Sequence, residues 1–326
     1  MVKSDTIFSI SSESEFQEIA LEVFRYQAVN TAVYRDFLSL LKINPEKISD
    51  YRQIPFLPVE FFKSHEIITE GIKPEIVFES STTSGSIPSK HYVANVDLYT
   101  ESFMKGFEKF YGNPADYCIL ALLPSYLERK GSSLVFMANE LILQSKHQES
   151  GFYLDEHDKL ITLLKNLQKG GKSCILIGVT FALLDLADRY KESLSNIRIM
   201  ETGGMKGRRK EMVRDDLHSY LKSRFSITAV HSEYGMTELL SQAYSKGEGK
   251  FYCPPWMKVL IRDSYDPMQI LPVGSTGGIN IIDLANLHSC SFIASSDLGR
   301  LNDDASFEVL GRMDNSDIRG CNLMIG

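Results

Sequence analysis

A chain of 326 residues, 43% hydrophobic and 24% charged, has ordinary globular composition and enough apolar residues for one large domain or two closely packed halves. Its net charge of −7 excludes a broad basic surface for nucleic acid or anionic lipid, so an anionic ligand would need a local site. The five cysteines (118, 174, 253, 290 and 321) form no CxxC pair and no Cys/His cluster, which argues against a disulfide framework or a zinc site and favours the reducing cytoplasm.

The N-terminal region, residues 1–75, is predicted to be helical and to pack on the rest of the chain. Its first residues lack the apolar core of a signal peptide. Ser12 and Glu15 have the spacing of a capping box, and a second amphipathic stretch follows as far as about residue 41. The apolar residues of the first helix recur at helical spacing and would share one face: Phe16, Ile19, Ala20, Val23 and Phe24.

Beyond residue 117, short apolar runs alternate with helical segments. The predicted helices are residues 132–143 and 180–190, and the predicted strands are residues 117–123, 173–179, 197–200, 227–230, 259–261 and 279–282. The longest apolar run, residues 174–184, is too short to span a bilayer. The alternation predicts an α/β core over residues 76–326, with mixed sheets covered by helices. Ligands of such sheets bind at loops beyond the carboxyl ends of the strands.

A hydroxyl-rich segment, residues 80–90, is the first candidate for a ligand loop. Five consecutive Ser or Thr residues precede Gly85, Ser86 and Lys90. Small side chains leave the backbone amides free to surround a phosphate, and the hydroxyls can donate to its oxygens. The segment is not a Walker A loop, and from its residues alone an ordinary solvated Ser/Thr-rich turn remains the alternative.

Four motifs in a fixed order resemble those of the adenylate-forming enzymes, which include acyl-CoA synthetases, peptide-synthetase adenylation domains and luciferase-type ligases. HSEYGMTE (231–238) follows a predicted strand and resembles their YGxTE signature, and residues 80–90 resemble their phosphate loop. SDLGR (296–300) resembles the aspartate segment near the end of their large domain, and LGRMDNSDIRG (310–320) resembles their hinge motif. METGG (200–204) stands where they have a glycine-rich loop that contacts adenine.

Within that superfamily, the chain most resembles the acyl-protein synthetases, the ATP-dependent subunit of the fatty-acid reductase of bacterial luminescence. The resemblance covers nearly the whole chain beyond the N-terminal helices. It is carried by LPSYLERKGSSLVFM (123–137), ETGGMKGRRKE (201–211), HSEYGMTELLSQAYS (231–245), PPWMKVLIRD (254–263), IDLANLHSCSFIASSDLG (282–299) and LGRMDNSDIRGC (310–321).

The resemblance implies a nucleotide site that holds ATP and Mg²⁺. The triphosphate would be held by Thr83, Ser84, Gly85, Ser86 and Lys90, while Thr237 would donate to the α-phosphate and Glu238 would bind Mg²⁺. Gly203 and Gly204 would contact adenine, Tyr234 would stack on it, Asp297 would accept from the ribose hydroxyls, and Arg312 would hold ribose or phosphate.

Each of these side chains also has an ordinary structural interpretation. Tyr234 could be a core aromatic, Glu238 a carboxylate at the start of a helix, Asp297 a turn residue and Arg312 a surface cation. His231 could line the acyl site or be a core histidine.

The sequence departs from the superfamily pattern in two places. The phosphate loop is one residue shorter than TSGSTGxPK, with Ile87, Pro88 and Ser89 before Lys90, and the loss of a glycine would stiffen it. The chain ends at Gly326, where most members continue into a mobile C-terminal domain with a catalytic lysine. We therefore expect that domain to be absent, as it is from acyl-protein synthetases, and expect no full CoA-ligase cycle.

Cys321, in IRGCNLM, matches the cysteine that accepts the acyl group in acyl-protein synthetases. A thioester would keep the acyl group reactive toward a partner reductase or a carrier protein, whereas the alternative is a small buried side chain. The other four cysteines are interpreted as structural.

The sequence thus predicts a cytoplasmic ligase that activates a fatty acid with ATP and transfers the acyl group to a protein thiol. Two alternatives remain: a ligase that passes a different acid to CoA or a carrier protein, and a non-catalytic nucleotide-binding relative. No nucleic acid and no membrane span are expected, and the oligomeric state stays open, with a homodimer as one option.

Overall fold

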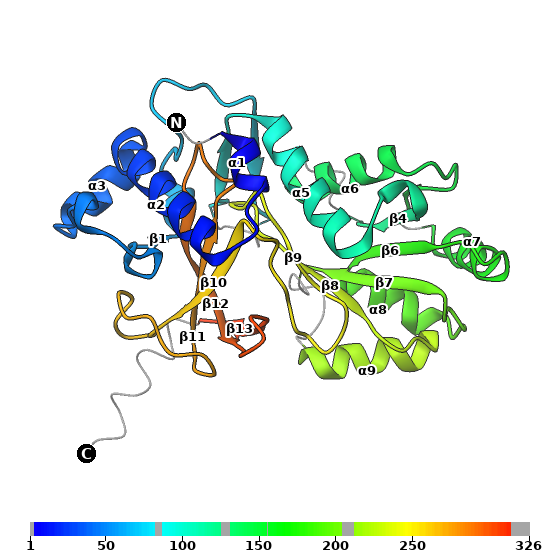
Figure 1. The fold of residues 1–326 in the computed structure, drawn as a ribbon. Coiled ribbons are helices and arrows are strands. Elements are labelled where there is room, and N and C mark those ends of the chain that lie inside the picture. Colours follow the sequence, from blue (N-terminus) through cyan, green and yellow to red (C-terminus); the bar gives the residue numbers. More distant parts are fainter. Residues whose placement is uncertain (1–2, 82–86, 125–130, 155, 204–211, 314–326) are drawn as a thin grey trace, which may run out of the picture. The chain divides into compact units, whose positions relative to one another are not determined.

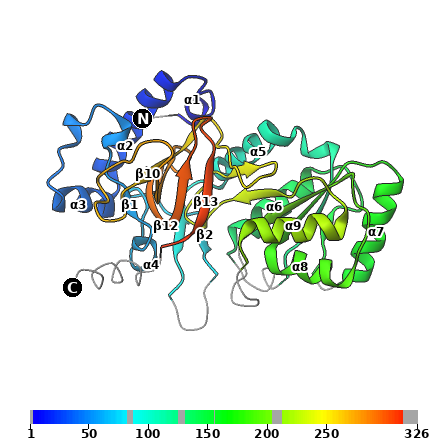
Figure 2. The same ribbon diagram turned by 90° about the horizontal axis from the view of Figure 1, so that it is seen from below.

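A computed structural model describes residues 3–81, 87–124, 131–154, 156–203 and 212–313 (Figures 1 and 2). The chain divides into two compact units. The first unit consists of Met1–Ile76, His91–Leu98 and Tyr252–Gly326, and the second consists of Val77–Lys90 and Tyr99–Phe251. The predicted N-terminal region therefore lies in the first unit.

The first unit is built around a five-stranded sheet. Its strands are β1 (Leu57–Pro58), β10 (Met257–Arg262), β11 (Thr276–Asp283), β12 (Phe292–Leu301) and β13 (Phe307–Arg312). Strands β10, β11, β12 and β13 pair antiparallel in that order, and β1 pairs parallel with Ile293 and Ala294 of β12. Figure 2 shows β12 and β13 side by side.

Helices from the start of the chain pack on this unit. They are α1 (Ser4–Phe8), α2 (Glu13–Asn30), α3 (Ala32–Leu40) and α4 (Phe61–Ser64), with short 3₁₀ turns at Pro45–Lys47 and Tyr51–Gln53. The predicted capping box is confirmed, because the Ser12 side chain accepts from the backbone N–H of Glu15 and the Glu15 carboxylate accepts from that of Ser12. The predicted apolar face of α2 is buried, and its Phe24 ring meets Phe292 of β12 edge-on at 5.9 Å.

Gln27 of α2 is a fully buried polar side chain that joins the helix to the loop before β12. Its amide nitrogen donates to the carbonyl oxygens of Asn286 (3.0 Å) and Leu287 (2.9 Å) and to the Ser291 hydroxyl (3.1 Å). Its amide oxygen accepts from the backbone N–H of Ser291 at 2.9 Å. Both its amide nitrogen and its amide oxygen therefore have partners inside the protein.

We expect Gln27→Leu to lower the free energy of unfolding by about 3 kcal/mol, because it leaves buried backbone groups without partners. Gln17 is the matched control: it also bonds to backbone at two places, the Ser49 carbonyl and the Tyr51 N–H, but at a half-buried site. Gln17→Leu should cost less than about 1 kcal/mol. Denaturant unfolding of both variants measures the difference, and equal losses would contradict this role for Gln27.

The second unit contains a six-stranded sheet in the order β5-β4-β6-β7-β8-β9. Its strands are β4 (Cys118–Leu122), β5 (Gly151–Phe152), β6 (Cys174–Val179), β7 (Ile197–Thr202), β8 (His231–Tyr234) and β9 (Ala243–Ser245). All neighbours pair parallel except β9, which is antiparallel to β8. The connecting helices are α5 (Val96–Tyr111), α6 (Ser133–Gln144), α7 (His157–Lys169), α8 (Thr180–Arg189) and α9 (Arg214–Phe225) (Figure 1).

One apolar cluster covers one face of this sheet. It contains alternate residues of two buried strands: Cys118, Leu120 and Leu122 of β4, and Leu176 of β6. The apolar residues of helices α7, α8 and α9 belong to the same cluster. The opposite face carries the residues between these positions. Two further strands, β2 (Ile76–Glu79) and β3 (Lys90–Val93), form a separate two-stranded sheet at the points where the chain passes between the units.

Most predicted elements are confirmed within one or two residues, but the strand predicted at residues 227–230 is wrong. That segment has no ladder partner in the described chain, and β8 occupies the next four residues, beginning where His231 pairs with Met200. Ile227 and Val230 are nevertheless buried, because they pack into the core beneath the sheet. The segment resembles a strand in sequence because its apolar side chains are buried, although its backbone does not pair with another strand.

No helix in the described ranges is both long and apolar enough to cross a bilayer. Cys118, Cys174, Cys253 and Cys290 are free thiols.

Candidate active site

The parallel strands β7 and β8 end side by side in the second unit, and four of the predicted site residues follow these ends. Thr202, the last residue of β7, pairs with Glu233 of β8. Gly203 comes directly after β7, and Tyr234 ends β8 before the turn that holds Thr237 and Glu238. The carboxyl ends of parallel strands are the usual place for a ligand in an open α/β sheet.

A buried carboxylate, Glu201, organises the end of β7. Its Oε2 accepts from the Thr180 hydroxyl at 3.0 Å, and its Oε1 lies 3.6 Å from Nε2 of His218 and 3.7 Å from Nε of Arg214. Burial alone would raise the pKa of Glu201, but His218, Arg214 and the Thr180 hydroxyl outweigh it and lower that pKa below its ordinary value. Glu201 therefore carries its negative charge inside the protein.

The Thr180 hydroxyl also contacts the backbone of Gly203, which is predicted to contact adenine. The same hydroxyl lies 2.9 Å from the carbonyl oxygen of Gly203, so one O–H group is shared between two acceptors. Gly203 has a φ of 68°, a left-handed conformation that glycine adopts without steric cost. Gly203 is thus joined to Thr180, the first residue of α8.

A second buried carboxylate, Glu233, lies beside the first. The Thr202 hydroxyl donates to its Oε2, across the register of β7 and β8. Burial is the main cause that raises the pKa of Glu233 to about 7, and the negative charge of Glu201 raises it further. Gly235 follows Tyr234, and a Cβ atom there would force the Glu233 carboxylate to move.

We expect Glu233 to make the folded protein less stable as the pH rises from about 5 to 8. The pKa of about 7 in the folded state lies above the ordinary value of a glutamate side chain, so in this range the folded protein binds more protons than the unfolded chain. Ionisation of Glu233 should therefore remove about 2 to 3 kcal/mol of stability between pH 5 and 8. Glu233→Gln keeps an acceptor for Thr202 without this charge.

Denaturant unfolding at pH 5 and pH 8 tests this expectation. From pH 5 to pH 8, the free energy of unfolding of the wild-type protein should fall by about 2 to 3 kcal/mol more than that of Glu233→Gln. Parallel pH dependences in the two proteins would show that Glu233 is already ionised at pH 5.

The predicted adenine and metal residues occupy distinct environments. Tyr234 is buried, and its ring meets that of Phe251 at 5.9 Å with an angle of 61° between the planes. Phe251 in turn lies under the Arg214 guanidinium at 4.8 Å. Glu238 is buried in a turn, so its interpretation as a carboxylate at the start of a helix is wrong. Thr237 precedes it and is half-buried.

The hydroxyl-rich segment is the connection between β2 and β3. Ser80 and Ser89 close it: the Ser80 N–H donates to the Ser89 carbonyl at 3.0 Å, and the Ser89 N–H donates to the Ser80 hydroxyl at 2.9 Å. Lys90 begins β3, where its Nζ lies 3.4 Å from Glu79 Oε1 at an exposed position. Thr83, Ser84, Gly85, Ser86, Gly204 and Cys321 lie outside the described residues.

Asp297 and Arg312 belong to the first unit and are brought together by its sheet. They are paired residues of β12 and β13, and the Arg312 Nε lies 3.8 Å from Asp297 Oδ1. Arg312 is 86% exposed, whereas Asp297 is 17% exposed. Asp297 lies within a strand, so its interpretation as a turn residue is wrong. A largely exposed guanidinium beside a mostly buried carboxylate suits the recognition of a polar ligand group.

The donor set at the end of β8 suits Mg²⁺ bound with phosphate. Within the described chain, no group of three or more His, Cys, Asp or Glu residues could form a metal cage. Mg²⁺ retains water ligands and is commonly held by one or two carboxylates together with substrate phosphates. The single carboxylate of Glu238 is compatible with that mode.

The sequence analysis did not predict the buried network of Thr180, Glu201, Glu233, Arg214 and His218. A signal was present for Glu201, because it interrupts the apolar pattern of β7 just before the strand ends. A carboxylate at that position in a parallel sheet is buried unless it faces a ligand loop. The helix α9 residues carried no such signal, since only the tertiary fold brings them to Glu201.

Comparisons with known proteins agree on family and fold. A family model described as acyl-protein synthetase, LuxE, matches residues 6–326. No curated protein matches the sequence. An open conformation of 2-hydroxyisobutyryl-CoA ligase, in complex with 2-HIB-AMP and CoA, is similar over 93% of this chain and 70% of its own, with 12% identity and a TM-score of 0.69.

Crystal structures of MatB proteins are also similar. ATP-bound MatB from Rhodopseudomonas palustris is 17% identical and has a TM-score of 0.55, over 72% of this chain and 47% of its own. An ATP-bound RpMatB-BxBclM chimera has a TM-score of 0.56, with the same identity and coverage. The chain thus spans about half the length of the MatB structures that it matches. These likenesses confirm the predicted fold class, the mixed α/β fold of the adenylate-forming ligases.

Proposed function

Because the chain belongs to the acyl-protein synthetase (LuxE) family, we propose that it activates a fatty acid with ATP and transfers the acyl group to a cysteine thiol. The observation that carries this proposal is the arrangement at the ends of β7 and β8, where Gly203, Tyr234, Thr237 and Glu238 follow two adjacent parallel strands. The fold is shared with ligases whose crystal structures contain ATP or an acyl-AMP, which supports the same first step.

In that step, a carboxylate oxygen of the fatty acid attacks the α-phosphorus of ATP, and pyrophosphate leaves. Such chemistry depends on positioning and on neutralising the phosphate charges. Glu238 would hold Mg²⁺, which would neutralise phosphate charge when bound. The Thr237 hydroxyl would donate a hydrogen bond to an α-phosphate oxygen. Thr83, Ser84, Gly85, Ser86 and Lys90 would hold the β- and γ-phosphates.

The nucleoside would be recognised by the residues that the family resemblance assigns to it. Tyr234 would stack on adenine, supported from behind by Phe251 and Arg214. Gly203 and Gly204 would contact the edge of the base. Asp297 would accept from the ribose hydroxyls, and Arg312 would hold ribose or phosphate.

In the second step, the Cys321 thiolate would attack the acyl carbonyl and displace AMP, which leaves a thioester. Two other cysteines are unsuited to this role, because burial raises the pKa of Cys253 and of Cys290 to about 12 and keeps both as neutral thiols. The acyl group would then pass to a reductase or a carrier protein in the cytoplasm.

The test of this function is fatty-acid-dependent exchange of labelled pyrophosphate into ATP, with Mg²⁺ present. We expect exchange with fatty acids and none without an acid. If exchange occurs only with short or aromatic acids, the substrate is such an acid and not a fatty acid. The absence of exchange with any acid, together with no thermal stabilisation by Mg·ATP, would overturn the function as a whole.

A further inference from the structure

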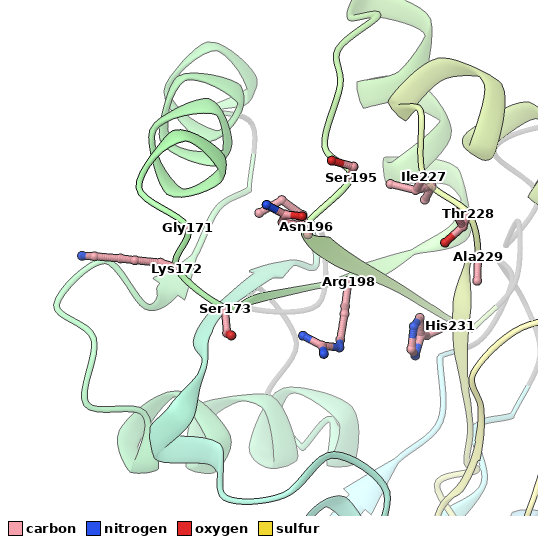
Figure 3. A pocket seen from close by; sticks show the side chains of 11 residues that line it. Gly171, Lys172, Ser173, Ser195, Asn196, Arg198, Ile227, Thr228, Ala229 and His231 are labelled. Atoms are coloured by element: carbon pink, nitrogen blue, oxygen red, sulfur yellow. The ribbon is translucent and has the colours of Figure 1, made fainter.

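A pocket of about 440 Å³ lies in the second unit, at the end of the sheet opposite to the candidate active site. Its lining comes from the segments that lead into β6, β7 and β8 (Figure 3). Of the lining residues, Arg198 lies five residues before Gly203, about 17 Å away at the usual rise per residue of a strand, and His231 lies three residues before Tyr234, about 10 Å away. Its volume lies within the range of small-molecule sites. The acid-activating chemistry proposed above does not use this pocket.

The register of the strands places a row of polar side chains on one face of the sheet at this end. Arg198 pairs with Ile175, so Ser173, two residues before Ile175, lies on the same face as Arg198. His231 pairs with Met200, two residues after Arg198, and therefore also shares that face. Figure 3 shows the Arg198 guanidinium between the side chains of Ser173 and His231.

Beyond the residues that line the pocket, the row continues to Lys246. Ser245 of β9 pairs with Ser232, so Lys246 follows at the level of His231. Its Nζ lies 5.8 Å from the centroid of the Tyr111 ring, and the Arg198 guanidinium lies 5.3 Å from that of the Tyr117 ring. Both cations are thus held over aromatic faces, which limits their conformational freedom before a ligand arrives.

The charge in this region is positive and uncompensated. No acidic residue is among those that line the pocket. Lys172 is neutralised by Glu149 at 2.9 Å, but Arg198 and Lys246 have no carboxylate within ion-pair distance in the described parts of the chain. Burial first, then the charges of Arg198 and Lys246, lower the pKa of His231 to about 4, so its ring is neutral at pH 7.

A neutral His231 can act as a hydrogen-bond donor here. The Tyr111 hydroxyl lies 3.1 Å from Nδ1 of His231. When this hydroxyl donates to Nδ1, the ring proton is on Nε2 and is available to a ligand. Arg198, Lys246 and the Ser173 hydroxyl add further donors around the same space.

We propose that this pocket binds a small phosphate-bearing anion. Two uncompensated cations match a dianion in charge, and the planar guanidinium suits the oxygens of a phosphate group. The same chemistry serves free inorganic phosphate and a phosphate monoester.

The test follows the imidazole resonances of His231 in the full-length protein during titration with inorganic phosphate, with chloride used to keep ionic strength constant. His231→Gln assigns the resonances. We expect a saturable shift below about 10 mM phosphate. Arg198→Gln and Lys246→Gln should each weaken binding about tenfold or more, because each removes a charge-assisted contact.

Lys159→Gln is the matched control, since Lys159 also lies over a tyrosine ring, that of Tyr153, at 5.6 Å but outside the pocket. It should leave the titration unchanged. A parallel titration with glycerol phosphate distinguishes the two ligand forms, and saturable binding of either upholds the site. The proposed site would be overturned if no saturable shift is seen. It would also be overturned if the titration is unchanged in both Arg198→Gln and Lys246→Gln.

Discussion

Glu238→Gln should lower fatty-acid-dependent pyrophosphate exchange by about a hundredfold or more, while leaving the fold intact. The substitution retains the size of the side chain but removes the only carboxylate that the proposed mechanism assigns to Mg²⁺. Loss of one such electrostatic contact to the reacting phosphates is worth about 3 kcal/mol or more in the transition state. The effect should persist at saturating ATP if it acts on the chemical step.

Two controls separate this outcome from a structural one. Because Glu238 is buried, the far-UV circular dichroism and the unfolding midpoint of the variant must first match those of the wild type. Glu108→Gln, on the exposed side of α5, should exchange pyrophosphate at the wild-type rate. Wild-type exchange in Glu238→Gln would remove this residue from the mechanism, although the family assignment would stand.

Cys321→Ser should abolish stable labelling of the protein by radioactive fatty acid in the presence of Mg·ATP, while pyrophosphate exchange remains close to wild type. The two steps separate because adenylation needs no thiol, whereas only a thiolate can form the thioester. The wild-type label should survive denaturing gel electrophoresis and be released by hydroxylamine.

Cys253→Ser provides the matched control, because the thiol of Cys253 remains protonated at neutral pH and should not carry the label. This variant should label like the wild type. If Cys321→Ser keeps its hydroxylamine-sensitive label, another residue carries the acyl group. If it loses exchange as well as labelling, the segment that contains Cys321 contributes to adenylation itself.

Local signals in the sequence were sufficient for much of the fold. The capping box of Ser12 and Glu15 depends on residues three apart, and the buried strands β4 and β6 are continuous apolar runs, so both could be recognised without knowledge of distant contacts. The strand predicted at residues 227–230 failed for a different reason. Its apolar residues are buried by packing, and hydrogen-bond pairing begins only at His231.

The candidate site residues differ in the same way. Some could be recognised from local motifs, whereas the contacts of others depend on residues far away in the sequence. Motifs were sufficient to identify Gly203, Tyr234, Thr237 and Glu238, which the structure brings to one end of β7 and β8. The pairing of Asp297 with Arg312 was not predicted, because the register of β12 and β13 shifts between Leu298 and Gly299. The contacts of Glu201 with α9 also depend on residues more than ten positions away, which no local pattern records.

The shared hydroxyl of Thr180 has a consequence for the hydrogen bonding of Gly203. A single proton cannot fully satisfy both the Glu201 carboxylate and the Gly203 carbonyl, so each receives only part of a hydrogen bond. If the amino group of an incoming base donated to Gly203, Thr180 could turn completely to Glu201. This exchange of hydrogen-bond partners would cost little enthalpy, so Gly203 could bind a base without a net loss of hydrogen bonds.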